Sequence, residues 1–336
     1  MTSHNSPHPS AIFEGWYSKF RLPSGSSIAL IISSVPHARP PAKKKYMISF
    51  NYVSPDGSTW WQRETWPEKW EVTNGAGGDF TIQWEDGRFG ATGQTMFWRL
   101  ESADIQFIAT LPTRGVPWKP DDQASTPAGL LTRLPLPIQW HVHTVDAPAE
   151  FTLNLKDTKL YPGDEQGTAQ VHAEKNWAVS FPKSNIWIQA RDHDRHRGVS
   201  LAGGSLFPGV QAYLVGYHGN SFHDFSPPSS TSLFGLSLGL KSHVDSTKGE
   251  AEVDIKGWFS RIRIFARADT ETFFTLAAPL DTGHAEGWTA QSFAAVIDVE
   301  VYQRSWPWTG WVKVDGDRFE RGSLEYGGSL YKAHGK

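Results

Sequence analysis

The chain has 336 residues, with 32 Lys and Arg against 35 Asp and Glu, a formal net charge of −3 and no cysteine. This balance excludes the basic surface that nucleic-acid binding requires, and the lack of cysteine excludes disulfides, thiolate metal sites and a cysteine nucleophile. Hydrophobic residues make up 39% of the sequence, and 16 residues are Trp, whose flat and polarisable rings suit a pocket for an apolar or cationic guest. The length predicts two domains.

The first twelve residues are rich in Ser, His and Pro and predict a disordered tail, residues 1–12. They lack the basic and apolar regions of a signal peptide, and no later run approaches the roughly 18 apolar residues of a membrane span. We therefore expect a soluble, cytoplasmic protein without stable membrane insertion.

Short strand-like runs follow from residue 13 onward, beginning with Phe13–Phe20, Ser27–Val35 and Tyr46–Val53. The apolar centre of Ser27–Val35 predicts a strand buried on both faces. The stretch Pro112–Pro137 contains six prolines and predicts a long loop, either disordered or serving as a lid. The charged cluster Asp192–His196 is typical of a solvated turn. No capped run of about 12 residues has a helical period.

These patterns predict an all-β protein. Many short antiparallel strands must close into a barrel or pack as two sheets to protect their edges, and a barrel of about eight strands can hold a small ligand. We expect two lipocalin-like antiparallel β-barrel or β-sandwich domains packed together, with a pocket in or between them. Residues 13–170 would form the N-terminal β domain and residues 171–336 the C-terminal lipocalin-like β-barrel domain.

The strand-like stretch that begins at His172 is the main candidate site. It places Glu174, Lys175, Asn176 and Trp177 on consecutive positions of an otherwise apolar run. In a strand, His172, Glu174 and Asn176 share one face, and Lys175 and Trp177 share the other. Neither face matches a half-buried strand, so we expect one of them to line a cavity. A solvated edge strand, or a structural ion pair between Glu174 and Lys175, would explain the same residues without a site.

Two histidines, His141 and His143, lie two residues apart on the next candidate strand upstream, Ile138–Thr144. A metal site would need further ligands, for which His172 and Glu174 are the nearest candidates, and we expect no metal. There is no glycine loop opening a helix and no nucleophile elbow. We expect no cofactor, which favours reactions that acids, bases and rings perform alone, such as cyclisation and isomerisation.

Several motifs recur in the order in which one known family carries them. The central motif His172-Ala173-Glu174-Lys175-Asn176-Trp177 is followed by Phe181-Pro182 and Trp187-Ile188-Gln189, and the opening motif is Phe13-Glu14-Gly15-Trp16-Tyr17. Further matches are Trp140-His141-Val142, Leu214-Val215-Gly216-Tyr217-His218, Phe225-Ser226-Pro227 and Leu324-Glu325-Tyr326-Gly327-Gly328. From residue 13 to about 330, this series resembles the tocopherol cyclase family.

The sequence departs from that family at three places. Ala178-Val179-Ser180 replaces the glycine run that follows the central Trp, Ile186 replaces the first aromatic residue of the Trp-x-Trp-x-Gln motif, and no plastid transit peptide precedes Phe13. These departures favour a fungal or bacterial type of cyclase with a specialised-metabolite substrate over a plant enzyme of vitamin E synthesis.

The resemblance implies a cyclase that needs no cofactor. Tocopherol cyclases protonate an alkene on a prenyl chain, and a neighbouring phenol oxygen captures the tertiary cation to close a ring. Such a step needs a proton donor in a dry pocket and aromatic faces around the cation. By this resemblance, Glu174 is the acid or orients it, and Lys175 and Asn176 hydrogen-bond a substrate oxygen. The substrate-binding candidates are Trp177, Trp140, Trp187, Gln189, His141, Glu14 and Tyr17.

Other functions remain open on the sequence alone. A Diels–Alder or hetero-Diels–Alder cyclase of terpenoid or polyketide metabolism would act by folding its substrate into a reactive pose and would not need the acid. A lipocalin-like carrier would use the same pocket to bind an apolar small molecule without chemistry. A stress-related lipid-binding protein would have no small pocket. For the cyclase, the Diels–Alder enzyme and the carrier, the expected partner is an apolar small molecule. The oligomeric state stays open.

Overall fold

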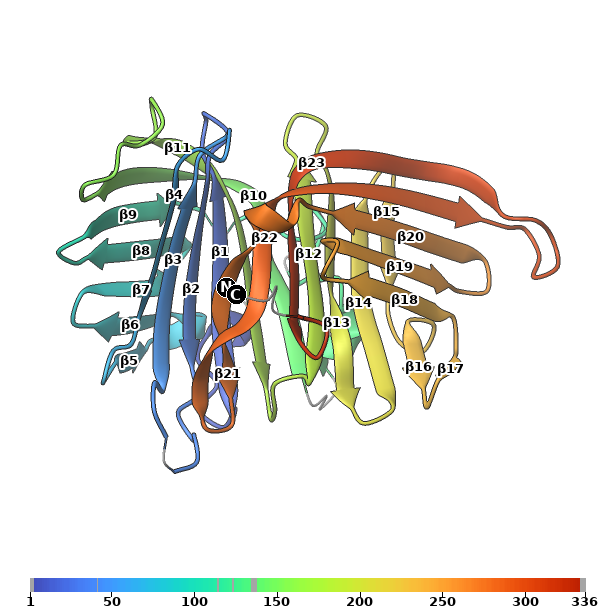
Figure 1. Cartoon of the computed structure of the whole chain (residues 1–336), viewed down its shortest axis with the longest axis horizontal. Helices are drawn as coiled ribbons and strands as arrows, with labels where there is room; N and C mark the ends of the chain where they lie inside the picture. The colour runs from blue at the N-terminus through green and yellow to red at the C-terminus, as the bar shows by residue number, and fades with distance from the viewer. Residues whose placement is uncertain (1–2, 41, 114, 123, 134–137, 333–336) are drawn as a thin grey trace. The chain divides into compact units, whose positions relative to one another are not determined.

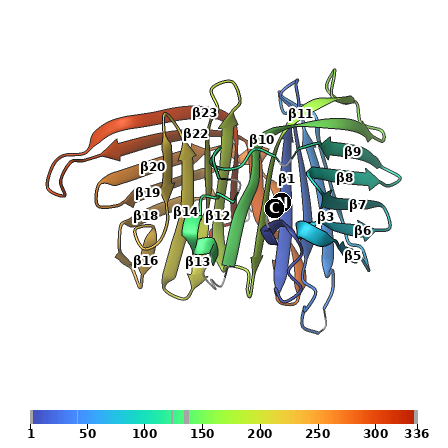
Figure 2. The same cartoon turned by 180° about the vertical axis from the view of Figure 1, so that it is seen from behind.

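The computed structural model describes residues 3–40, 42–113, 115–122, 124–133 and 138–332. Within these ranges the chain forms 23 β-strands and four short 3-10 turns, with no α-helix (Figure 1, and Figure 2 from behind). The strands belong to two large antiparallel sheets, each of which curls on itself. The expected all-β architecture built on two sheets is therefore confirmed. No helix in the described ranges has the length and apolar character to cross a membrane.

The first compact unit, unit 1, comprises Met1–Thr126, Leu136–Ser180 and Pro279–His284. Its sheet has the strand order β4-β3-β2-β1-β11-β10-β9-β8-β7-β6-β5. The strands are β1 (Phe13–Arg21), β2 (Ser27–Ser34), β3 (Tyr46–Val53), β4 (Trp60–Thr65), β5 (Glu71–Asn74), β6 (Phe80–Trp84), β7 (Gly87–Thr92), β8 (Thr95–Glu101), β9 (Ile105–Leu111), β10 (Ile138–Leu155) and β11 (Gln166–Ala178). The 3-10 turns η1 (Ser3–Asn5) and η2 (Ala76–Gly78) also belong to this unit.

Unit 1 curls because its strands bury large side chains on one face. In β9, Ile105, Phe107, Ala109 and Leu111 are buried while the residues between them are more exposed, which is the period of two expected for a half-buried strand. Trp16 of β1 lies 6.0 Å from Phe89 of β7 between ring centroids, although these strands are far apart in the sheet order. The aromatic core thus holds the two halves of the sheet face to face. As predicted, β2 is buried on both faces.

The second unit, unit 2, comprises Pro127–Pro135, Phe181–Ala278 and Ala285–Lys336. Its sheet runs β17-β16-β14-β13-β12-β23-β22-β20-β19-β18, with β15 beside β14 and β21 beside β22, and forms a nearly closed barrel. The strands are β12 (Ser184–Asp192), β13 (Arg197–Phe207), β14 (Val210–His218), β15 (Phe222–Phe225), β16 (Thr231–Leu233), β17 (Leu236–Ser237), β18 (Leu240–Asp245), β19 (Glu250–Lys256), β20 (Ser260–Arg267), β21 (Phe274–Leu280), β22 (Gly283–Gln303) and β23 (Val312–Gly328). The 3-10 turns are η3 (Gly129–Arg133) and η4 (Thr270–Thr272).

The domain boundary expected at residue 170 falls inside β11, which belongs entirely to unit 1. Backbone pairing explains the difference, because β11 lies between β1 and β10 and hydrogen-bonds to both. The boundary between the two units lies after Ser180. Residues 279–284 also belong to unit 1, although they lie in the second half of the sequence.

The expected disordered tail instead makes specific contacts at several of the residues that the structure describes, from residue 3 onward. Asn5 is buried, and its carbonyl accepts a hydrogen bond of 2.8 Å from the indole Nε1 of Trp16. Ser6 Oγ donates a hydrogen bond of 2.9 Å to the carbonyl of Gly78. The composition suggested disorder because it contains few aliphatic residues, but the segment is held by hydrogen bonds and by the rings described below.

The described residues of the Pro112–Pro137 stretch up to Thr126 belong to unit 1 and pack within it. Thr126 is buried, and its hydroxyl accepts a hydrogen bond from the amide of Val142. The amide of Val116 donates a hydrogen bond of 2.7 Å to the hydroxyl of Thr144. These contacts flank an irregularity in the pairing of β10 with β11, where the register shifts between Val142 and Thr144. His143 is the extra residue of this β-bulge.

Candidate functional site

Three adjacent strands of unit 1 bring the main candidate residues together. The register aligns Trp16 of β1 with Lys175 of β11, and Lys175 with His141 of β10. Directly opposed residues of antiparallel strands share a face. Trp16, Lys175 and His141 therefore form a row across the sheet, on the face where Trp16 and Ala173 join the aromatic core.

The ammonium group of Lys175 is the centre of this row. The residue has no exposed surface, and its Nζ lies 2.9 Å from a carboxylate oxygen of Glu14. Nζ also donates hydrogen bonds to the carbonyl of Ser6 and, at 2.8 Å, to Nδ1 of His8. The three partners accept all three ammonium protons. Nζ further lies 4.2 Å from the ring centroid of Trp16, a cation–π geometry.

Burial and the neighbouring charges set the protonation of this centre. Burial lowers the pKa of Lys175 to about 8, although the Glu14 carboxylate opposes the change. Burial also disfavours the ionised form of Glu14, but hydrogen bonds from His8 and attraction to Lys175 prevail and hold its pKa below the usual value. At neutral pH the pair is a carboxylate and an ammonium, and the ammonium loses its proton far more readily than an exposed lysine does.

A column of stacked rings covers the same face. The ring of His8 stacks on Trp177 with centroids 4.2 Å apart, and His4 stacks on Trp177 at 5.7 Å and on His141 at 5.3 Å. His141 and His143 continue the column at 4.4 Å. Burial, together with the nearby His4, lowers the pKa of His141 to about 3, so this imidazole stays neutral. His141 Nδ1 and His143 Nε2 are buried without a hydrogen-bond partner among the described residues.

The opposite face of the three strands carries the other half of the predicted motif. There Glu174 Oε2 lies 3.0 Å from Nε2 of the buried His172. Glu174 is aligned with Tyr17 of β1 and Val142 of β10. The alternative explanation, an ion pair between Glu174 and Lys175, is contradicted, because successive strand residues point to opposite faces and Lys175 pairs with Glu14.

Asn176 and Trp140 are also aligned across this second face. Trp140 is buried, and its indole Nε1 has no hydrogen-bond partner in the described part of the chain. Asn176 lies opposite Gly15, where an added Cβ would come within 3.0 Å of its side-chain oxygen. The glycine of the opening motif thus makes room for the amide of the central motif.

Trp187 and Gln189 belong to β12 of unit 2 and are both buried. Trp187 is aligned with Ala202 of β13 and Glu325 of β23, and Gln189 with Ser200 and Ser323. These two candidates therefore line a sheet other than that of Lys175, and their expected substrate-binding role stays a prediction.

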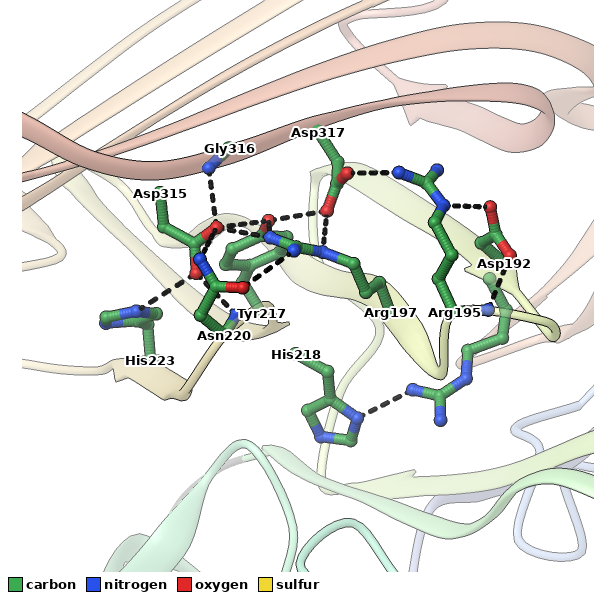
Figure 3. A network of polar contacts seen from close by, with 11 residues as sticks. Asp192, Arg195, Arg197, Tyr217, His218, Asn220, His223, Asp315, Gly316 and Asp317 are labelled. Carbon is green, nitrogen blue, oxygen red and sulfur yellow. Dashed lines mark hydrogen bonds and ion pairs between the residues drawn. The ribbon is translucent and has the colours of Figure 1, made fainter.

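Unit 2 contains a second polar cluster that the sequence did not reveal (Figure 3). Arg197 of β13 forms ion pairs with Asp315 and Asp317 of β23. Its guanidinium also donates a hydrogen bond of 2.8 Å to the hydroxyl of Tyr217. Burial opposes ionisation of Asp315, but the amides of Asn220 and Gly316 and the Arg197 guanidinium hold its pKa below the usual value. Because Arg197 and Tyr217 pair with Asp315 and Asp317, we interpret the cluster as a structural tie between β13, β14 and β23.

Sequence reasoning also missed His4, Ser6 and His8, which complete the Lys175 site. The available signal was the pair of histidines four residues apart in a segment with no other ionisable side chain. The turn Asp192–His196 is largely exposed, as expected for a solvated turn. No group of three or more His, Asp or Glu residues within the described ranges could hold a metal ion.

Comparison with known proteins finds solved structures with a similar fold. No family model matches the chain, and no curated protein matches it in sequence. Among solved structures, a protein provisionally assigned as AttH from Nitrosomonas europaea is similar with a TM-score of 0.52 and 12% identity, over 98% of this chain and 96% of that one. Kievitone hydratase from Nectria haematococca is similar with a TM-score of 0.51 and 11% identity, over 97% of this chain and 92% of that one. The chain therefore shares its two-sheet fold with an enzyme, kievitone hydratase.

Proposed function

We propose that this protein is a cofactor-independent enzyme that cyclises an apolar, unsaturated small molecule by proton transfer, with Lys175 as the proton donor. The observation that carries the proposal is the buried Lys175 ammonium, held by Glu14 and His8 among the rings of Trp16 and Trp177. Its pKa of about 8 lies close to neutral pH, which is the condition for efficient acid–base catalysis.

The proposed reaction conserves atoms and charge. Lys175 would turn one Nζ proton from Nδ1 of His8 to the substrate and give it to one alkene carbon while a substrate hydroxyl oxygen attacks the other, so a C–O bond forms as the C=C bond becomes single. The hydroxyl proton then returns to Lys175, with Glu14 holding the neutral amine in position. The reaction is an isomerisation, because the substrate gains and loses no atoms overall. The faces of Trp16 and Trp177 would stabilise developing positive charge by up to about 2 kcal/mol each when desolvated.

Hydration is a second candidate, favoured by the fold shared with kievitone hydratase. Addition of water to an alkene and internal ring closure begin with the same protonation. They differ in whether water or a substrate hydroxyl supplies the oxygen. The Lys175 centre serves both reactions, and the product distinguishes them.

The test is incubation with a prenylated hydroquinone in deuterated buffer, followed by mass spectrometry. We expect a ring-closed product with one carbon-bound deuterium, and a rate that falls as the pH rises past about 8 because Lys175 loses its proton. Lys175→Met should reduce the rate by about 100-fold or more, the usual contribution of a catalytic acid.

Glu174→Gln is the matched control, because Glu174 is the neighbouring residue in sequence but lies on the opposite face. If Glu174→Gln abolished turnover while Lys175→Met did not, the acid would be Glu174. A cyclised product without deuterium would indicate a pericyclic enzyme, and tight binding without conversion would indicate a carrier. A product heavier by one water would identify a hydratase.

A further inference from the structure

Four tryptophans and a phenylalanine gather at the ends of two neighbouring hairpins in unit 2. Trp258 and Phe259 form the turn between β19 and β20, and Trp306, Trp308 and Trp311 follow β22. Trp258 is 75% exposed, Trp306 58% and Trp308 80%. We call these five residues the aromatic tip. Exposed aromatic groups of this size are uncommon on soluble proteins and mark interaction surfaces.

The tip is built as a fixed structure. The amide of Arg304 donates a hydrogen bond of 3.0 Å to the carbonyl of Phe259, and its Nε donates one of 2.8 Å to the carbonyl of Trp258. Arg304 therefore joins the two hairpins. The guanidinium also donates to the carbonyl of Pro307 and lies 4.3 Å from the ring centroid of Trp311. The rings of Trp306 and Trp308 stack with centroids 5.4 Å apart. Figure 1 shows the β22–β23 hairpin extending beyond the neighbouring strands of the same sheet.

The two segments that form the tip carry positively charged side chains only. The segments 255–261 and 301–314 contain Lys256, Arg261, Arg304 and Lys313 and no Asp or Glu. The nearest carboxylates are Asp254, which lies 2.6 Å from Arg261 and 4.0 Å from Lys256, and Glu300, which lies 3.0 Å from Lys313. Asp315, which follows the second segment, pairs with Arg197. The four cations outnumber Asp254 and Glu300, so the tip keeps a net positive charge. An occupant that matches both features must offer an apolar layer beneath a negatively charged surface.

We propose that the aromatic tip docks reversibly on an anionic lipid surface. Tryptophan is the side chain best suited to the boundary between headgroups and acyl chains, because its ring is apolar and its N–H remains hydrogen-bonded to the polar layer. Lysine and arginine at the rim attract anionic headgroups. This peripheral contact is independent of the reaction proposed above and would give an enzyme of apolar molecules access to substrates dissolved in lipid.

The experiment is co-sedimentation of the full chain with phosphatidylcholine vesicles, with and without phosphatidylserine. We expect binding to the vesicles that contain phosphatidylserine, weakened by salt. Trp306→Ala combined with Trp308→Ala should lower the affinity by about tenfold or more through lost apolar contact. Lys256→Gln and Lys313→Gln should each lower it by about fivefold. Brominated lipids should quench tryptophan emission of the original chain more than that of the tryptophan variant.

Trp60→Ala is the matched control, since Trp60 is a similarly exposed tryptophan in β4 of unit 1 and should leave binding unchanged. Circular dichroism and thermal melting show that each variant is folded. Absence of binding to either vesicle, or equal binding by the double tryptophan variant, would overturn the proposal. Concentration-dependent self-association that the same double variant abolishes would overturn it as well, because a second copy of the chain would then be the occupant.

Discussion

The buried pair of Glu14 and Lys175 explains why two distant motifs occur together in the sequence. Two charges with almost no solvent contact are stable only when each compensates the other. The register of β1 against β11 places Glu14 and Lys175 on one face. His8 contacts both residues, and its amide donates a hydrogen bond of 2.8 Å to the Glu14 carboxylate. Either residue alone would be an uncompensated buried charge.

We therefore expect strong energetic coupling within this pair. Lys175→Met or Glu14→Gln alone should lower the free energy of unfolding by about 3–5 kcal/mol, whereas the double variant should lose much less than the sum. Denaturant unfolding of the four proteins measures the coupling. The exposed pair Arg99 and Glu101 provides the matched cycle, which should show no measurable coupling. Additive losses at Glu14 and Lys175 would contradict the assigned ion pair.

The sequence identified the residues of this site better than it identified their partners. Alternation correctly separated Glu174 from Lys175 onto opposite faces, because the period of a strand is independent of what surrounds it. It could not identify Glu14 as the partner of Lys175, since that depends on which strand lies beside β11 and in which register. Nor could it show that His172 would be the neighbour that binds Glu174.

At the scale of elements, the N-terminal segment Ser3–Ile12 completes the site. Its carbonyls and imidazoles take the place of water around Lys175, and its rings stack on Trp177. Water excluded in this way is the cause of the low pKa of Lys175. Composition alone predicted disorder here, because the stabilising partners lie in β1 and β11 rather than within the segment.

His8 variants test this role of the segment. His8→Ala removes both the acceptor for Lys175 and the stacking on Trp177, and should admit water, which raises the pKa of Lys175 towards its ordinary value near 10.5. The alkaline limb of the pH–rate profile should therefore move to higher pH. His8→Phe keeps the stacking ring and should move the limb less. His243→Ala, at an exposed position in β18, should leave the profile unchanged. An identical profile in all variants would show that the segment does not control the proton donor.

At the scale of the whole molecule, each unit has its own hydrophobic core. The core of unit 1 is rich in aromatic residues, whereas that of unit 2 is built mainly from Ile, Val, Leu and Ala. The all-β class and the presence of two sheets followed from alternation, turn residues and the length of the chain. The boundary did not, since β11 pairs with strands on both sides and residues 279–284 return to unit 1 from the second half of the sequence.

The two units also differ in how they respond to acid, because most of the histidines with lowered pKa values lie in unit 1. Among the described residues these are His4, His141, His143 and His284 in unit 1 and His223 in unit 2. Burial is the main cause in each case, and it holds the pKa of His141 at about 3 and that of His284 at about 4. In the unfolded chain these groups titrate near 6.5.

Unit 1 should therefore lose stability first as the pH falls. Between about pH 6.5 and 4 the unfolded chain binds protons that the folded unit does not, so each such histidine removes up to about 1.4 kcal/mol of stability per pH unit. Hydrogen exchange at pH 7.5 and pH 5, corrected for the intrinsic exchange rate, should show loss of protection in β1, β10 and β11 before β12, β13 and β14. His284→Gln should reduce this difference, whereas His193→Gln in the exposed β12–β13 turn should not. Equal loss of protection in both units would mean that they unfold together and that buried histidines do not decide where acid acts first.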